Sequence, residues 1–128
     1  TLVYTGLRWH VRGWCEKNQA YRDFVLSRFR DVPEILDDSE HGSDGDLDWH
    51  TDVVIRITPD PRLRPDQREV VEVDYGMTDG ALEVHTRARL VPYVLKLLHI
   101  DPGEMADDPA AQQIVVENRE ALQRWLFG

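Results

Sequence analysis

The feature that most constrains this chain is its middle stretch, residues 31–52, which carries nine acidic residues and no Lys or Arg. The stretch also contains Gly42, Ser43 and Gly45 and few apolar side chains. Such a composition is typical of a solvated loop, because it buries too little apolar surface to offset the entropy of ordering the chain. We therefore predict two packed pieces, residues 1–30 and 53–128, joined by an acidic linker at residues 31–52.

The two outer pieces differ in charge. Residues 1–30 carry six basic and two acidic residues, whereas residues 53–128 carry nine basic and thirteen acidic residues. The formal net charge of the whole chain is -9. A balance this acidic argues against a surface that coats nucleic acid or binds anionic lipid, and it leaves only a local basic patch to bind an anion.

Several classes of protein are excluded by composition. With 128 residues, 41% of them hydrophobic, the chain can bury a core and is not disordered as a whole. A single cysteine, Cys15, cannot form an internal disulfide or a multi-cysteine zinc site, which favours a reducing, cytoplasmic setting. No apolar run approaches the ~20 residues of a membrane span. The sequence opens at Thr1 directly into an apolar, β-prone stretch, so we expect a fragment of a longer protein.

Alternating side chains predict strands in the first piece. From residue 7 to residue 15 an apolar series alternates with a basic and aromatic one, which is the period of a strand whose apolar side is buried. The apolar series is Leu7, Trp9, Val11, Gly13 and Cys15, and the other is Arg8, His10, Arg12 and Trp14. A second alternation places Arg22, Phe24, Leu26 and Arg28 on one side. We predict three antiparallel strands, at about residues 1–5, 7–15 and 21–29.

The second piece is expected to repeat a strand followed by a helix. A β-branched run at residues 53–57 precedes a helix that has Pro65 in its first turn and ends at Gly76. An alternating strand at residues 82–86 precedes helical spacing over residues 90–98. Further apolar patterns predict a strand at 114–116 and a helical turn at 121–126. The fold class is therefore α+β, a meander of three strands followed by a small α/β sandwich.

The candidate binding site lies on the first piece. It combines basic groups with neighbouring aromatic rings, which suits a nucleotide or a single-stranded nucleic acid, because guanidinium groups bind phosphate bidentately and aromatic rings stack on bases. Its members are His10, Arg12, Arg22, Arg28, Trp9, Trp14 and Phe24. A second interpretation stays open, in which Trp9 and Phe24 are core and the arginines are solvated or pair with the acidic linker.

Two further site types are disfavoured. The segment Asp44–Asp48 resembles the opening of a calcium loop, but Trp49 and Ile55 occupy the positions of its turn glycine and bidentate glutamate, so we expect no metal. A hydrolase that uses Cys15 and His10 is disfavoured, because the two residues alternate to opposite faces of one strand. Phosphate-cradling glycine loops and nucleophile motifs are absent. We therefore expect a binding protein without a cofactor, not an enzyme.

Two stretches of the first piece resemble the C-terminal half of a WYL domain. They are Gly6–Cys15, which is similar to that family's G-x-x-W-Y-L strand, and Tyr21–Phe29, which is similar to its second strand. Residues 53 to about 98 are similar to the extension that follows WYL domains. His10 and Val11 stand where the family has Tyr and Leu, and the change at His10 alters hydrogen bonding there. The sequence of residues 8–12 is most similar to that of the repressors that accompany BREX and CBASS phage-defence islands.

This resemblance implies a fold and a role. WYL domains form a small Sm-like β-barrel, of which this chain holds about three strands, and the proteins are mostly homodimeric transcriptional regulators. It implies that His10, Arg12, Arg22 and Arg28 border a ligand pocket, with Trp9 and Phe24 packing partly beneath it. Duplex DNA is then bound only through an N-terminal domain that the sequence lacks, and no membrane is involved.

Two functions remain as hypotheses. In the first, the chain is the ligand-sensing and dimerisation portion of a transcriptional regulator, and its effector is a nucleotide or a single-stranded oligonucleotide. The acidic linker is then a hinge, and it occupies the basic face as a phosphate mimic when no effector is bound. In the second, the chain is an assembly module that binds no ligand.

Overall fold

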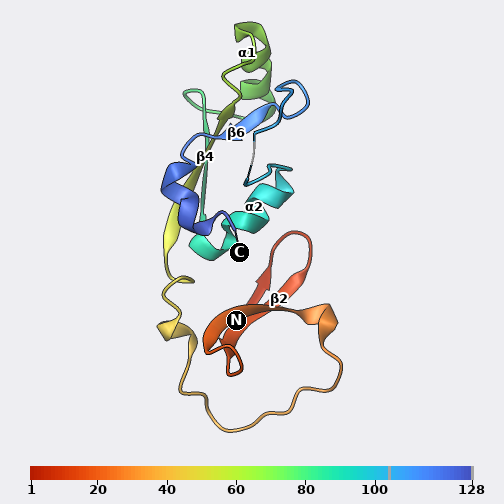
Figure 1. The fold of residues 1–128 in the computed structure, drawn as a ribbon, viewed down its shortest axis with the longest axis vertical. Helices are drawn as coiled ribbons and strands as arrows, with labels where there is room; N and C mark the ends of the chain where they lie inside the picture. Colours follow the sequence, from red (N-terminus) through yellow and green to blue (C-terminus); the bar gives the residue numbers. More distant parts are fainter. Residues whose placement is uncertain (104, 128) are drawn as a thin grey trace. The chain divides into compact units, whose positions relative to one another are not determined.

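The computed structural model describes residues 1–103 and 105–127 and divides into two compact units, Thr1–His50 and Thr51 onward (Figure 1). Each unit contains one three-stranded antiparallel sheet. The predicted α+β class is confirmed. The first unit includes nearly all of the acidic stretch, since residues 31–50 belong to it.

The first sheet is the predicted meander. Its strands are β1 (Leu2–Tyr4), β2 (Trp9–Cys15) and β3 (Ala20–Val25), in the order β1-β2-β3. The sheet is open, so no barrel is closed within the described residues. The third strand is shorter than predicted. Its last pair joins Val25 to His10, and because β2 begins at Trp9, residues 26–29 have almost no strand left to pair with. Of these, residues 26–28 form the short helix η1 (Leu26–Arg28) instead.

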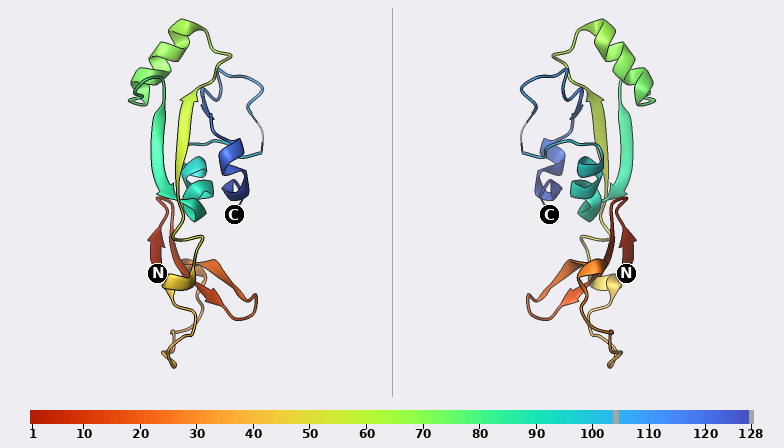
Figure 2. Two further views of the ribbon diagram at one scale, coloured as in Figure 1. Left: turned by 90° about the vertical axis from the view of Figure 1, so that its left-hand side faces the viewer. Right: turned by 90° about the vertical axis from the view of Figure 1, so that its right-hand side faces the viewer.

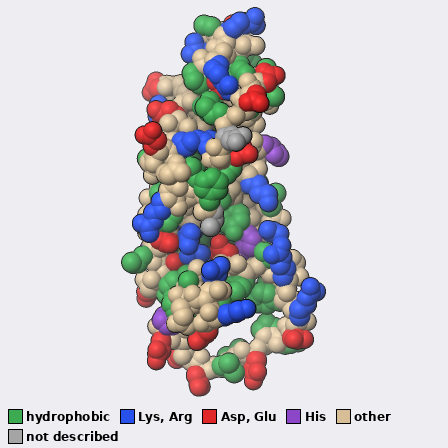
Figure 3. Space-filling view, viewed as in Figure 1, with side chains coloured by type: hydrophobic (Ala, Val, Ile, Leu, Met, Phe, Trp, Pro, Cys, Tyr) green, Lys and Arg blue, Asp and Glu red, His purple; other side chains and the backbone are tan. Residues whose placement is uncertain are grey.

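The acidic stretch changes character along its length. Residues 29–42 contain neither helix nor strand, and apolar side chains among them are exposed, Ile35 to 97% of its surface. Acidic side chains line this loop at the bottom of Figure 3. The single turn η2 (Ser43–Gly45) follows, and the next residues, Asp46 and Trp49, are buried. The stretch therefore begins as a solvated loop and ends as a packed part of the first unit.

The second unit follows the predicted order of strands and helices. Its elements are β4 (Asp52–Pro59), α1 (Pro65–Asp74), β5 (Leu82–Arg87), η3 (Ala88–Leu90), α2 (Val91–Leu97), β6 (Ile114–Val116) and η4 (Glu120–Trp125). β4 is the central strand, with β5 and β6 antiparallel on either side. α1 ends as predicted, because Gly76 adopts a positive φ of 61° that other residues rarely take.

One face of the second sheet supplies the core of this unit. α2 and η4 lie on the same side of the sheet (Figure 2) and bury apolar side chains with Ile55 and Ile57 of β4, each 0% exposed. The opposite face of β4 is polar, where Arg56 bonds Glu83 and Glu117 at 3.0 Å each. This alternation is the period-two pattern expected of a half-buried strand.

Two polar side chains support β4 and the turn that follows it. Asp60, fully buried, accepts hydrogen bonds from the Arg62 main-chain N–H at 2.9 Å and from the Arg62 guanidinium at 2.6 Å. These bonds lower the pKa of Asp60 despite its burial. Beyond β6, the Asn118 amide donates to the Val54 carbonyl at 2.7 Å and accepts from the Arg56 N–H at 2.9 Å. Asn118 thereby continues the hydrogen-bond ladder of β4 with its side chain.

Candidate ligand-binding faces of the first sheet

The register of the first sheet assigns each candidate residue to one of two faces. Residues directly opposite in an antiparallel pair share a face. The polar face, as we name it, comprises His10, Arg12 and Trp14 with their partners Val3, Val25, Asp23 and Tyr21. The aromatic face comprises Trp9, Val11 and Gly13 with their partners Leu2, Tyr4, Phe24 and Arg22. The sheet therefore separates His10 and Arg12 from Trp9, Arg22 and Phe24.

The buried side of β2 is the reverse of the prediction. His10 is 2% and Arg12 5% exposed, whereas Trp9 is 49% exposed. The prediction was wrong because it treated charge as a marker of exposure. A guanidinium group can be buried when carboxylates neutralise it and accept its hydrogen bonds, and Arg12 has such partners.

Arg12 is held by two carboxylates. Its Nε and Nη2 donate to Oδ2 and Oδ1 of Asp46 at 2.6 and 2.9 Å, and its Nη1 donates to Asp23 at 3.2 Å. The Arg12 and Asp46 side chains are 3% and 5% exposed. Burial alone lowers the pKa of Arg12, but the bonds to Asp46 and Asp23 outweigh it, and the pKa lies above its ordinary value. The pair is a buried, bidentate ion pair that ties the acidic stretch to β2.

Aromatic rings lie beside this ion pair on the same face. The His41 ring stacks on Trp14 with centroids 3.8 Å apart and planes 10° from parallel, and Tyr21 meets Trp14 edge-on at 5.2 Å. The Tyr21 hydroxyl donates to the Gly42 carbonyl at 2.8 Å. A Cβ added to Gly45 would lie 2.7 Å from that hydroxyl oxygen, so a larger residue would push the Tyr21 side chain away from the segment. Residues 41–46, which we call the docked segment, therefore lie against the polar face through ring stacking, hydrogen bonds and close packing.

The aromatic face is exposed. Tyr4 and Trp9 are 58% and 49% exposed, with ring centroids 5.1 Å apart, and Phe24 is 36% exposed. Arg22 is exposed opposite Gly13, where an added Cβ would meet nothing within 4 Å. This face therefore presents a guanidinium group beside open space and aromatic rings. Arg28 lies in η1, exposed and outside the sheet.

The residues that join the sheet to the docked segment were only partly visible in the sequence. Trp14 shares the alternation of Arg12 and was part of the predicted cluster. The second interpretation, in which arginines pair with the acidic stretch, holds for Arg12, which pairs with Asp46. No local pattern marked His41 or Asp46, because the contacts that give them a role come from residues about 30 positions away.

Other reactive groups form no dyad or metal cluster that the structure describes. Cys15 lies on the aromatic face and His10 on the polar face. Hydrogen bonding from the Asn18 backbone, and secondarily from its side chain, lowers the pKa of Cys15 despite the opposing effect of burial. Asp46, in the calcium-like segment, bonds Arg12. Across the described residues, no group of three or more His, Cys, Asp or Glu is placed to hold a metal ion.

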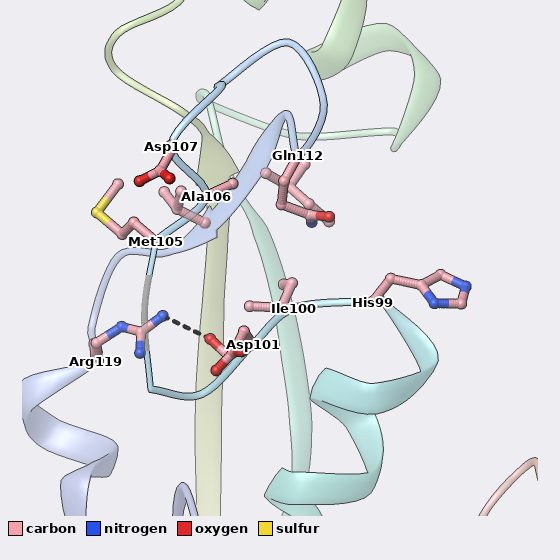
Figure 4. A pocket seen from close by; sticks show the side chains of 10 residues that line it. His99, Ile100, Asp101, Met105, Ala106, Asp107, Gln112 and Arg119 are labelled. Carbon is pink, nitrogen blue, oxygen red and sulfur yellow. Dashed lines mark hydrogen bonds between the residues drawn. The ribbon is translucent and has the colours of Figure 1, made fainter.

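A cavity of about 300 Å³ lies in the second unit (Figure 4). Arg119 lines it together with His99, Asp101 and Met105. The Arg119 guanidinium donates to the main-chain carbonyls of Pro102 and Asp101. Arg119 therefore has a structural role at this cavity, because its hydrogen bonds connect the loop after α2 with the segment after β6. None of the described helices is long and apolar enough to cross a membrane.

Comparisons with known proteins match both units. Residues 52–122 match the family described as BrxR transcriptional regulator, C-terminal dimerization domain, and residues 1–34 match the WYL domain. The chain is 37% identical over 125 residues to the DNA-binding transcriptional repressor CapW of Stenotrophomonas maltophilia, covering 98% of this chain and 42% of that protein. CapW of Escherichia coli (strain KTE188) is 36% identical over 122 residues, covering 95% and 40%. CapW of Pseudomonas aeruginosa is 35% identical with the same coverage. The chain spans about two fifths of the length of these relatives.

Proposed function

Because the chain belongs to the BrxR family of transcriptional regulators, we propose that it is the effector-sensing and dimerising portion of a cytoplasmic DNA-binding repressor. In this proposal the operator is bound by a domain outside the 128 residues, and the first unit, within the WYL match, binds the effector. Effector binding must favour one conformation over another, because equal affinity for both shifts no equilibrium.

The proposed effector is a nucleotide or a single-stranded oligonucleotide. The observation that carries this is that both faces of one sheet combine guanidinium groups with aromatic rings. Arg12 already holds two oxygens of one carboxylate in the geometry that binds phosphate. Arg22 lies beside Phe24 on an open surface. We assign effector contacts to His10, Arg12, Arg22, Arg28, Trp9 and Phe24.

The proposed oligomer is a homodimer formed by the second unit. Val70 and Val73 of α1 are 59% and 76% exposed and lie three residues apart, on one side of the helix. The match to a dimerization domain supports a second copy of the chain as their partner. Val73→Glu should raise the dissociation constant of the dimer at least tenfold in sedimentation equilibrium, since it places a charge in an apolar contact. Arg68→Ala, on the other side of the same helix, should leave the dimer unchanged, and dimerisation of Val73→Glu equal to wild type would refute this assignment.

An assembly module without a ligand is the second candidate. It is favoured by the pairing of Arg12, whose charge is already neutralised by Asp46 and Asp23. In that function the buried arginine serves stability alone.

Fluorescence anisotropy of a fluorescein-labelled single-stranded decanucleotide, measured across a salt series, separates the two functions. Arg22→Ala/Arg28→Ala should weaken binding about tenfold and lower its salt dependence, because it removes two phosphate-binding groups. The matched control Arg64→Ala/Lys96→Ala removes the same charge from exposed positions of the second unit and should change binding less than twofold. No binding at low salt, by the wild-type chain or by chains substituted within residues 41–46, would leave only the assembly function.

A further inference from the structure

Arg12 and Trp14 lie two residues apart on the same face of β2. Two strand residues span about 7 Å, so the guanidinium fork and the indole ring are spaced for the phosphate and the base of one nucleotide. Both groups are occupied in this structure. Asp46 fills the fork with two hydrogen bonds, and the His41 ring covers the indole in a parallel stack.

The docked segment thus presents the two chemical features of a nucleotide in the arrangement that this face would bind. The carboxylate of Asp46 is a bidentate oxyanion, as a phosphate is. The His41 imidazole is a flat, nitrogen-containing aromatic ring, and its separation from Trp14 is that of stacked rings. We propose that Arg12 and Trp14 form a nucleotide-binding subsite, which the docked segment fills in cis and must vacate before an effector binds.

This inference rests on the proposed function and adds to it the subsite, the residues that block it and the order of events. Release is favoured by the loop that precedes the segment. Residues 29–40 have no regular structure, and Val32, Ile35 and Leu36 are 91%, 97% and 76% exposed. When the docked segment leaves the polar face, the preceding loop therefore loses few contacts. The cost of release lies mainly in the Arg12–Asp46 pair, the Trp14–His41 stack and the Tyr21–Gly42 hydrogen bond.

The second acidic partner of Arg12 has a different role in this scheme. Asp23 lies directly opposite Arg12 on β3 and is fixed by the sheet. It stays beside the guanidinium after the segment leaves, so Arg12 keeps one partner in the open state. Asp46 is supplied by the segment and departs with it. In this scheme Asp23 is therefore the structural partner of Arg12, and Asp46 is its regulatory partner.

The test uses the full 128-residue chain and the labelled single-stranded decanucleotide, at a fixed low salt concentration. Asp46→Asn removes the bidentate anion, and Gly45→Ala weakens docking without a change of charge, because its Cβ would displace the Tyr21 hydroxyl from its hydrogen bond with Gly42. Each should tighten binding about tenfold, the ratio expected when the segment occupies nine tenths of the subsites. His41→Ala keeps the ion pair and removes only the stack, and it should tighten binding by a smaller factor.

The matched control is Asp44→Asn, which removes the same charge from an exposed position of the same segment. It should change affinity less than twofold. Equal effects of Asp46→Asn and Asp44→Asn, together with no effect of Gly45→Ala or His41→Ala, would overturn the inference. If the wild-type chain still loses binding on Arg22→Ala/Arg28→Ala, the proposed function survives that result. If no chain binds, both fail.

Discussion

The geometry of the Arg12–Asp46 ion pair allows us to predict how much its loss lowers the free energy of unfolding. Its two side chains are 3% and 5% exposed, and two hydrogen bonds of 2.6 and 2.9 Å join them. Removing one partner of a buried ion pair costs about 3–5 kcal/mol, because the other charge is left unpaired. Asp23 stays at the guanidinium, so Asp46→Ala should lower the free energy of unfolding by the lower figure, about 3 kcal/mol.

A double-mutant cycle isolates the pair. Arg12→Met should also destabilise the chain, and the double variant should be more stable than the sum of the two single losses predicts, by about 2 kcal/mol. Urea unfolding reports this through fluorescence, since three of the four tryptophans, Trp9, Trp14 and Trp49, lie in the first unit. Losses that add within about 0.5 kcal/mol would show that the pair does not couple in solution and would refute the reasoning.

Three predictions concern other parts of the molecule. Asp60 has a lowered pKa in the folded chain, so its contribution to stability is present above its ordinary pKa of about 4 and is lost as pH falls through the lowered value. Thermal denaturation of Asp60→Asn should show a smaller acid-induced fall than wild type, and an equal fall would assign the acid sensitivity to other groups. Ile57→Ala should cost about 3 kcal/mol by urea unfolding, since Ile57 is 0% exposed in the second core; a loss below about 1 kcal/mol would contradict that packing. The lowered pKa of Cys15 predicts that the pH profile of its alkylation by iodoacetamide has a midpoint below the ordinary value of 9.0, and a midpoint at or above that value would count against the Asn18 contacts.

Local patterns predicted most of the fold because the signals lie within each element. Period-two alternation located β2 and β5, and Pro65 and Gly76 marked the two ends of α1. The end of β3 was missed because it depends on pairing. Leu26 continues the alternation of the strand, but β2 offers no partner beyond Trp9.

The site was harder to predict than the fold, because its faces depend on which charges are neutralised. Arg12 and Arg22 look alike in the sequence, yet one is buried between two carboxylates and the other is exposed. Asp46 belongs to a run of acids in which no local feature distinguishes the member that reaches β2. Only the three-dimensional contact separates it from its neighbour Asp44, whose side chain is exposed.

The Asn118 amide has a consequence for how sequences of this family can vary in length. Asn118 lies just beyond β6, and its amide bonds the main chain of Val54 and Arg56 on β4. These bonds fix the register of the three-residue strand β6 against β4. Residues 98–113, between α2 and β6, can then gain or lose residues without sliding β6 along β4. Length variation is therefore expected in the loop before β6, whereas an insertion between Val116 and Asn118 would move the amide away from its partners Val54 and Arg56 on β4.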